Sequence, residues 1–162
     1  MKTKIFNIIL IDKFNLFIPV EIFQPFADKK MSRVKVITKH LEKTIEFYAA
    51  IKMDKKSEDY KMMFSKQKQK ELNLELGNEF QIQLFEDTSK YGVEMPEELD
   101  AVLMSDYDAY TIFENLTKGK QRSIIYGVLR FKNSQQKIDK SLIMCENLKR
   151  GNHEPIKMFK LE

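Results

Sequence analysis

Apolar and polar residues alternate along the first half of the chain. In residues 44–52, every second residue from Ile45 to Ile51 is apolar, and the intervening positions are more polar. This period of two is typical of a β-strand with one buried face and one solvated face. The same alternation occurs in residues 33–38, 59–65 and 79–87. Residues 5–11 and 14–18 are apolar at most positions, which predicts strands that lie deeper, with both faces buried.

Six strands within about ninety residues must bury their inner faces on one another. A small antiparallel β-barrel does this and also removes exposed sheet edges. We therefore predict a barrel over residues 1–90. The side chains expected in its core are Phe47, Ile51, Phe64, Phe80, Ile82 and Leu84.

Two short helices are expected to interrupt these strands. One covers residues 20–26 and follows Pro19. The other covers residues 66–72, with Ser65 as its N-cap and Asn73 in a left-handed conformation where it ends. Gly77 and Asn78 are expected to form the turn into the last strand.

The apolar period changes to 3.6 after residue 91, which predicts helices. Pro96 suits the first position of a helix that carries acids in its first turn. Asp106, Thr117 and Ser134 are expected to cap the next three helices, and Gly151 to end the last of them. Residues 152–162 should dock loosely, through Ile156 and Phe159. The predicted fold class is α+β: a barrel, then a tail of three to four short helices over residues 91–162.

Composition supports a globular chain that folds in a reducing compartment. Of its 162 residues, 43% are hydrophobic and 32% are charged. Cys145 is the single cysteine, so an intrachain disulfide is excluded. The apolar run at residues 5–11 is too short for a signal peptide, and we find no stretch near the about 20 apolar residues of a membrane span. We expect a cytoplasmic protein without a membrane span.

The charge of the tail is divided into two opposite blocks. Residues 91–117 hold seven acids and no Lys or Arg, whereas residues 118–150 hold nine bases and two acids. We predict that the blocks attract each other, so that Arg122 or Arg130 lies within ion-pair reach of an acid from residues 94–114. The alternative is that the basic block binds a polyanionic partner.

Two groups of residues are candidate binding surfaces. The first is a stripe of cationic and aromatic residues spaced four apart, a pattern that suits phosphate contacts and base stacking. Its members are Lys118, Arg122, Tyr126 and Arg130. The second is a lysine group beside the second short helix, formed by Lys61, Lys66, Lys68 and Lys70. A solvated polar face is the alternative for both. Gly119, Ser123 and Gly127, also four apart, are expected to allow close helix packing.

We find no residue pattern that indicates catalysis, a cofactor or a metal. His40 and His153 lie in different halves of the chain, and neither has a Cys or carboxylate at metal-ligand spacing. Cys145 falls on the apolar face of its predicted helix, as a structural cysteine does. We therefore expect no enzymatic activity, no cofactor and no metal.

Several segments resemble the YdeI/OmpD-associated (bacteriocin-protection) family. Those of the tail are Met95-Pro96-Glu97-Glu98-Leu99, Leu116-Thr117-Lys118-Gly119-Lys120-Gln121-Arg122-Ser123 and Lys137-Ile138-Asp139-Lys140. Those of the barrel are Phe17-Ile18-Pro19-Val20-Glu21 and the run from Leu72 to Phe80, similar to a barrel domain that often precedes that module. The resemblance implies a bacterial protein with a double-split barrel, similar in shape to AbrB- and MazE-type DNA-binding folds. It implies a link to bacteriocin protection or stress, but no known activity.

These observations favour a non-enzymatic binding or interaction protein of unknown partner, with another protein as the first candidate. The alternative is a nucleic-acid-binding regulator that uses the basic surfaces of the barrel and of the third tail helix.

Overall fold

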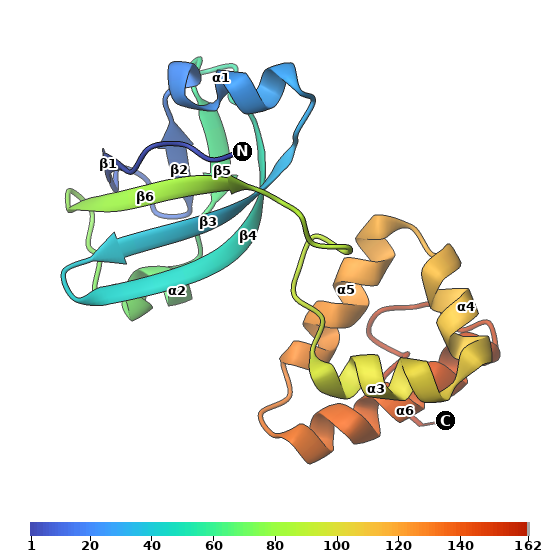
Figure 1. The fold of residues 1–162 in the computed structure, drawn as a ribbon. Helices are drawn as coiled ribbons and strands as arrows, with labels where there is room; N and C mark the ends of the chain where they lie inside the picture. Colours follow the sequence, from blue (N-terminus) through green and yellow to red (C-terminus); the bar gives the residue numbers. More distant parts are fainter. Residues whose placement is uncertain (162) are drawn as a thin grey trace. The chain divides into compact units, whose positions relative to one another are not determined.

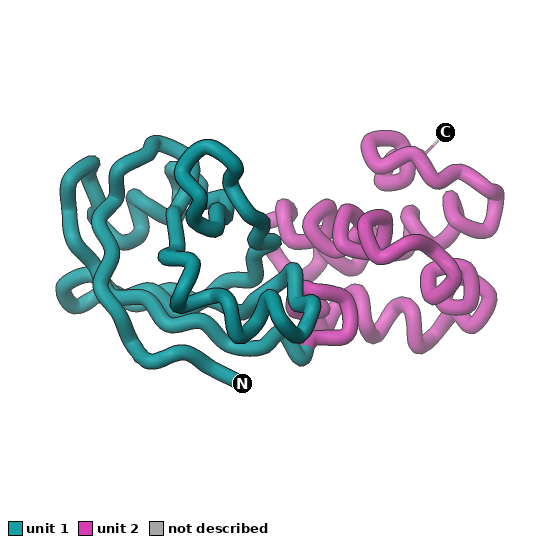
Figure 2. Tube along the Cα trace, turned by 90° about the horizontal axis from the view of Figure 1, so that it is seen from above, with its two compact units in different colours: residues 1–88 teal, residues 89–162 magenta. Residues whose placement is uncertain are grey.

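The computed structural model describes residues 1–161. The chain divides into two compact units, Met1–Thr88 and Ser89–Glu162 (Figure 2). Each unit has its own cluster of buried apolar side chains. We describe each unit by itself.

Within the described chain, six strands of the first unit form one antiparallel sheet in the order β1-β6-β3-β4-β5-β2 (Figure 1). Their bounds are Phe6–Ile9 for β1, Asn15–Ile18 for β2, Arg33–His40 for β3, Lys43–Met53 for β4, Tyr60–Met63 for β5 and Glu79–Glu86 for β6.

The two edge strands of this sheet are joined by a short connection. β1 pairs with β6 at one edge, and β2 pairs with β5 at the other. The N–H of Leu10 donates to the Asn78 carbonyl, and the N–H of Phe64 donates to the Phe14 carbonyl. Residues 10–14 therefore pass from one edge to the other, so the sheet curls into a nearly closed barrel. The predicted antiparallel barrel is confirmed.

The alternating pattern has the predicted phase. Ile51, Phe64, Phe80, Ile82 and Leu84 are buried in the barrel core. Phe47 is only half-buried, because it lies at the margin of the core, where its ring meets Phe64 on one side and the Lys68 ammonium on the other.

The prediction that residues 5–11 are buried on both faces is wrong. Ile8 and Leu10 are buried, but Ile5, Ile9 and Ile11 are exposed. β1 is an edge strand whose outer face meets solvent, so an apolar sequence does not guarantee burial there.

Two short helices accompany the barrel strands. α1 covers Val20–Asp28 and follows Pro19, and α2 covers Lys66–Glu71. The Ser65 hydroxyl accepts a hydrogen bond from the Lys68 N–H at 3.3 Å, which caps α2 as predicted. Asn73 follows with a φ of +53°, the left-handed conformation expected at this helix end.

The second unit holds four helices among its described residues: α3 (Glu97–Ser105), α4 (Tyr107–Asn115), α5 (Lys118–Leu129) and α6 (Ser134–Lys149). Asp106 and Thr117 cap α4 and α5 as predicted. Asn133, not Ser134, caps α6, because its side chain accepts the Gln136 N–H at 2.8 Å. Gly151 follows α6 with a φ of +80°.

Residues 152–161, which we call the strap, pass across α5 and α6. The Asn147 amide donates to the carbonyls of Met158 and Lys160, at 2.7 and 3.1 Å. Met158 and Phe159 are buried, whereas Ile156 is 76% exposed. Docking through Phe159 was predicted correctly, but Ile156 does not take part in it.

Candidate functional site

The predicted stripe lies along α5. Lys118 begins the helix, Arg122 and Tyr126 follow at one-turn intervals, and Arg130 is the C-cap residue. Tyr126 is 46% exposed and Arg130 is exposed. These side chains present two guanidinium groups and an aromatic ring along one helix.

Residues 116–123, which contain Lys118 and Arg122, form the joint between α4 and α5. The Thr117 hydroxyl accepts the Lys120 N–H at 3.3 Å and so caps α5. Gln121 is 1% exposed, and its amide donates to the carbonyls of Phe113 and Glu114 at the end of α4. These bonds satisfy carbonyls that a helix terminus leaves unpaired. Thr117 and Gln121 therefore have a structural role, whereas the side chains of Lys120, which is exposed, and of Arg122, which is half-buried, take no part in the joint.

A buried tyrosine organises the charges beside this joint. The Tyr91 hydroxyl donates to Glu114, and the Lys90 ammonium lies 3.1 Å from the other carboxylate oxygen. Burial raises the pKa of Tyr91 to about 12. Burial opposes ionisation of Glu114, but its bonds with Tyr91 and Lys90 outweigh this and lower its pKa. Lys118 donates to the Lys90 carbonyl at 3.3 Å, so its ammonium helps to hold this cluster together.

Residues 92–151 match the family model described as "Bacteriocin-protection, YdeI or OmpD-Associated". This part of the chain is similar to the domain of that family. The match covers all four helices of the second unit and ends before the strap. Comparison with curated proteins and with solved structures found no match.

Within the matched residues 92–151, the predicted ion pairs of α5 are not formed. Among the described residues, neither Arg122 nor Arg130 forms an ion pair with an acid from residues 94–114. The acids instead take other lysines: Glu114 pairs with Lys90, and Asp106 pairs with Lys149 at 2.8 Å. The attraction between the two charge blocks therefore acts between α4 and α6, because Lys149 lies in the last turn of α6 opposite the α4 cap.

Of the small residues spaced four apart on α5, Gly127 packs against the strap rather than against a helix. A Cβ atom added at Gly127 would clash with the Phe159 ring, so glycine at this position permits the close approach. Gly119 has no heavy atom within 4 Å of such a Cβ position, and Ser123 is exposed. The prediction of close helix packing is therefore wrong: of the three, Gly127 alone makes a close approach, and its neighbour is Phe159 of the strap.

Cys145 is buried on α6, as predicted. Burial raises the pKa of its thiol to about 12, so the thiol is protonated at neutral pH. Among residues 1–161 we find no group of three or more His, Cys, Asp and Glu side chains placed to hold a metal ion. In the same range, no helix is long and apolar enough to cross a membrane.

The lysine group of the barrel is divided between separate contacts. Lys61 pairs with Asp54 at 3.5 Å. Lys66 and Lys68 place their ammonium groups 5.5 and 5.0 Å from the ring centres of Phe14 and Phe47. Lys70 is exposed in the last turn of α2, where the helix dipole favours a cation. The α2 lysines therefore border exposed aromatic surface, whereas Lys61 is neutralised locally.

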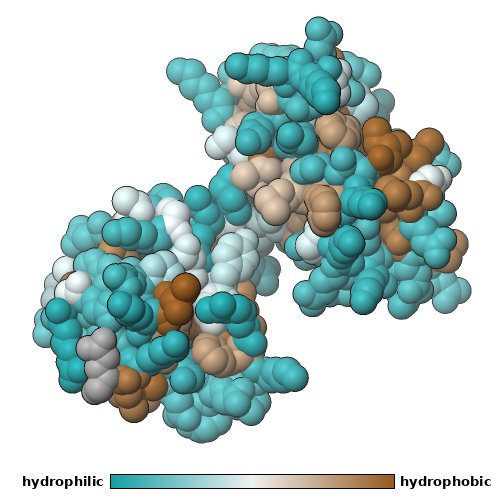
Figure 3. Space-filling view, turned by 180° about the vertical axis from the view of Figure 1, so that it is seen from behind, coloured by the Kyte–Doolittle hydropathy of each residue, from teal (hydrophilic) through white to brown (hydrophobic). Residues whose placement is uncertain are grey.

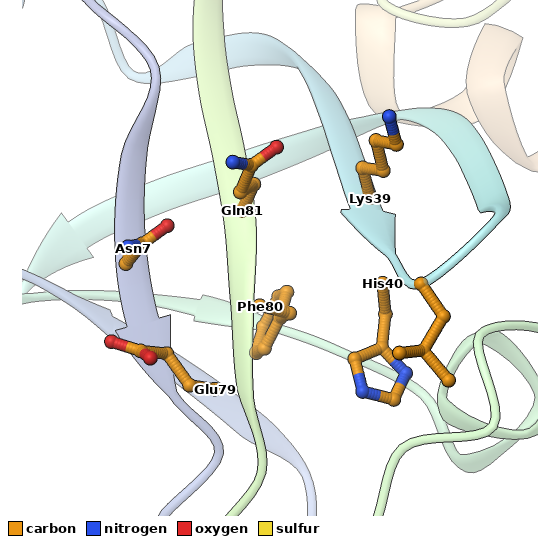
Figure 4. Close-up of a pocket in the computed structure, with 7 residues that line it drawn as sticks. Asn7, Lys39, His40, Glu79, Phe80 and Gln81 are labelled. Carbon is orange, nitrogen blue, oxygen red and sulfur yellow. The ribbon is translucent and has the colours of Figure 1, made fainter.

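A polar hollow of about 360 Å³ lies on the outer face of β1, β6 and β3 (Figure 4). Asn7, Gln81 and Lys39 form a row across these strands, because Gln81 is paired with both of the others. The Nδ1 atom of His40 lies 2.6 Å from the Leu72 carbonyl, to which it donates. Sequence reasoning missed this hollow, and the polar Asn7 inside an apolar run was its one signal.

The barrel also exposes a group of apolar residues that we call the apolar edge: Ile5, Ile9, Ile11 and Leu76. The Gly77 N–H donates to the Leu10 carbonyl, which brings Leu76 beside Ile11. Figure 3 shows hydrophobic patches that interrupt the otherwise hydrophilic surface of the barrel unit. Contiguous exposed apolar surface of this kind is typical of a protein contact site.

Proposed function

We propose that this chain is a non-enzymatic binding protein that takes part in bacteriocin protection and docks a protein partner on its apolar edge. The exposure of Ile9 at the end of edge strand β1, and of Ile11 just beyond it, is the observation that carries the proposal. An edge strand offers unpaired backbone groups as well as side chains, and both favour addition of a partner segment.

Large apolar side chains of the apolar edge are exposed to water. Ile9 is 53% and Ile11 is 69% exposed. Covering such side chains contributes roughly 25 cal/mol per Å² of apolar surface removed from water. A protein surface with complementary apolar groups would gain this free energy without any change within the barrel core.

The test uses bacteriocin-sensitive bacteria that produce the protein. We expect the wild type to improve survival under bacteriocin challenge, and the double variant Ile9→Gln with Ile11→Gln to lose this effect while its melting temperature stays unchanged. The matched control is Met104→Gln with Leu142→Gln, two comparably exposed apolar residues of the other unit. Equal protection by the edge variant and the wild type would disprove the proposal.

A second candidate function is a nucleic-acid-binding regulator, favoured by the absence of ion pairs at Arg122 and Arg130 within the described chain. Tyr126 lies between them on α5 and is accessible for base stacking. α5 also begins with Lys118 and has no acid in its first turn, so its positive end would be stabilised by an anion.

Salt-dependent retention on single-stranded DNA distinguishes this second candidate. A phosphate-binding surface loses affinity steeply with salt. Under this candidate, Arg122→Glu with Arg130→Glu should abolish retention, and Lys132→Glu with Arg150→Glu, which changes the net charge equally, should reduce it far less. Similar losses for both variants would indicate a general charge effect and exclude the regulator.

A further inference from the structure

The strap builds a groove that neither the family match nor the proposed function accounts for. This C-terminal groove has a volume of about 450 Å³ and lies at the end of α5. Its lining residues are Arg130, Phe131, Lys140, Ile156, Phe159 and Lys160. Half of them come from the strap, which follows the matched residues 92–151.

The floor of the groove is aromatic and rigidly held. Phe131 and Phe159 contact each other edge to face, with ring centres 6.2 Å apart. Phe159 is fixed by its close approach to Gly127 and by the Lys140 ammonium, which donates to the Phe159 carbonyl at 3.4 Å. Ile156, which is largely exposed, adds an aliphatic wall.

Cations border this apolar floor. Arg130 and Lys160 are exposed, and Lys140 lies over the Phe131 ring at 5.6 Å. The lining contains three cations and no carboxylate. A ligand that matches this distribution carries one anionic group beside an apolar body. The volume suits a small molecule, since ligand pockets occupy roughly 300–1,000 Å³.

We propose that the C-terminal groove binds a free carboxylate with an apolar chain, of the size of a medium-chain fatty acid. The carboxylate accepts hydrogen bonds from Arg130 and Lys160, and the chain lies against Ile156, Phe131 and Phe159. An aliphatic chain fits better than a stacked base, because the Lys140 ammonium already occupies a face of Phe131.

The test titrates the full chain with octanoate, followed by calorimetry and by NMR of the isoleucine methyl groups. Octanoate should shift the Ile156 methyl signals. Octanol and acetate should bind more weakly by roughly tenfold or more, because octanol lacks the carboxylate and acetate lacks the apolar chain. Shifts centred on another isoleucine would place the site elsewhere and overturn the proposal. So would octanol binding as tightly as octanoate.

Two variants test the residues named. Arg130→Gln with Lys160→Gln should weaken octanoate binding roughly tenfold or more, whereas Lys132→Gln with Arg150→Gln should leave it unchanged. Gly127→Ala should weaken it too, because the new Cβ displaces the Phe159 ring. Equal affinity in both double variants would overturn the proposal. Tighter binding of adenosine monophosphate or of anionic lipid vesicles would overturn the choice of a free carboxylate.

Discussion

Thr38 is a buried residue whose hydroxyl lacks a partner. It lies on β3 between Ile45 of β4 and Ile82 of β6. The side chain is fully buried, and its Oγ1 has no hydrogen-bond partner within the described chain. A buried polar group without a partner costs about 1–3 kcal/mol.

Thr38→Val should therefore increase the free energy of unfolding, by about 1 kcal/mol, because valine has the same shape and no hydroxyl. Urea denaturation measures the change. Thr44→Val on β4 is the control, because Thr44 is exposed and the same change there should have little effect. A loss of stability in Thr38→Val would mean that the hydroxyl is hydrogen-bonded in solution.

Phe80 tests the assigned phase of β6. Its side chain is 3% exposed, and its ring stacks on that of Phe64 with centres 5.9 Å apart. Phe80→Ala should cost ~3–5 kcal/mol, as truncation of a core phenylalanine does. Met63→Ala is the control, since Met63 is exposed. A loss below about 1 kcal/mol would mean that the two faces of the strand are exchanged.

At the scale of elements, one carboxylate joins α4 to α6. Asp106 accepts the Ala109 N–H at 3.1 Å and pairs with Lys149 at 2.8 Å. The Lys149 hydrogen bond and then the Ala109 N–H hold the pKa of Asp106 below its ordinary value of 3.8. The folded state therefore favours the ionised carboxylate, and this stability is present above pH 3.8 and is lost as the pH falls through the lowered pKa.

Asp106→Ala should reduce the free energy of unfolding at neutral pH by about 1–2 kcal/mol, the usual cost of losing an N-cap. The difference between wild type and variant should narrow in acid, where the wild-type carboxylate is protonated as well. Denaturation at several pH values measures it. Asp108→Ala, on the exposed side of the same first turn, should show a smaller and less pH-dependent change. A pH-independent difference would contradict the assigned role.

At the scale of the whole molecule, the two units have separate apolar cores. Phe64 and Phe80 belong to the first core, and Phe113 belongs to the second. Because each core holds only the elements of its own unit, damage to one core should act locally.

Phe113→Ala should therefore accelerate hydrogen exchange in α3 to α6 and leave β3 and β6 protected. Exchange followed by mass spectrometry measures both units in one experiment. Phe80→Ala is the reciprocal control and should affect the barrel alone. Faster exchange in both units after either substitution would show that they unfold together.

The sequence alone determined features that depend on neighbouring residues. The alternation in β4 and β6 predicted which side chains are buried, because a strand repeats every two residues. The caps Ser65, Asp106 and Thr117 were also predictable, because capping depends on residues close in sequence. Each hydroxyl or carboxylate accepts a hydrogen bond from the N–H three residues further along the chain. The run around Thr117 was one of the segments that indicated the family whose model matches residues 92–151.

Only the tertiary structure decided features that depend on distant residues. β1 has the composition of a buried strand, but only one of its faces meets the barrel core, so Ile9 is exposed, as is Ile11 just beyond the strand. Leu142 lies one helical turn from Ile138 in the sequence, yet it is 49% exposed, because the strap and the other helices cover the side of α6 that carries Ser141 and Met144.

Charge pairing is the clearest case of this limit. The two oppositely charged blocks of the tail predicted that they attract each other, and an ion pair between them is present. The blocks did not predict which residues form that pair. Helix packing brings Lys149 to Asp106 and leaves Arg122 and Arg130 without an acidic partner in the described chain. Net charge is a sum over sequence, whereas an ion pair requires two side chains within a few ångström, and only the packing of the helices sets that distance.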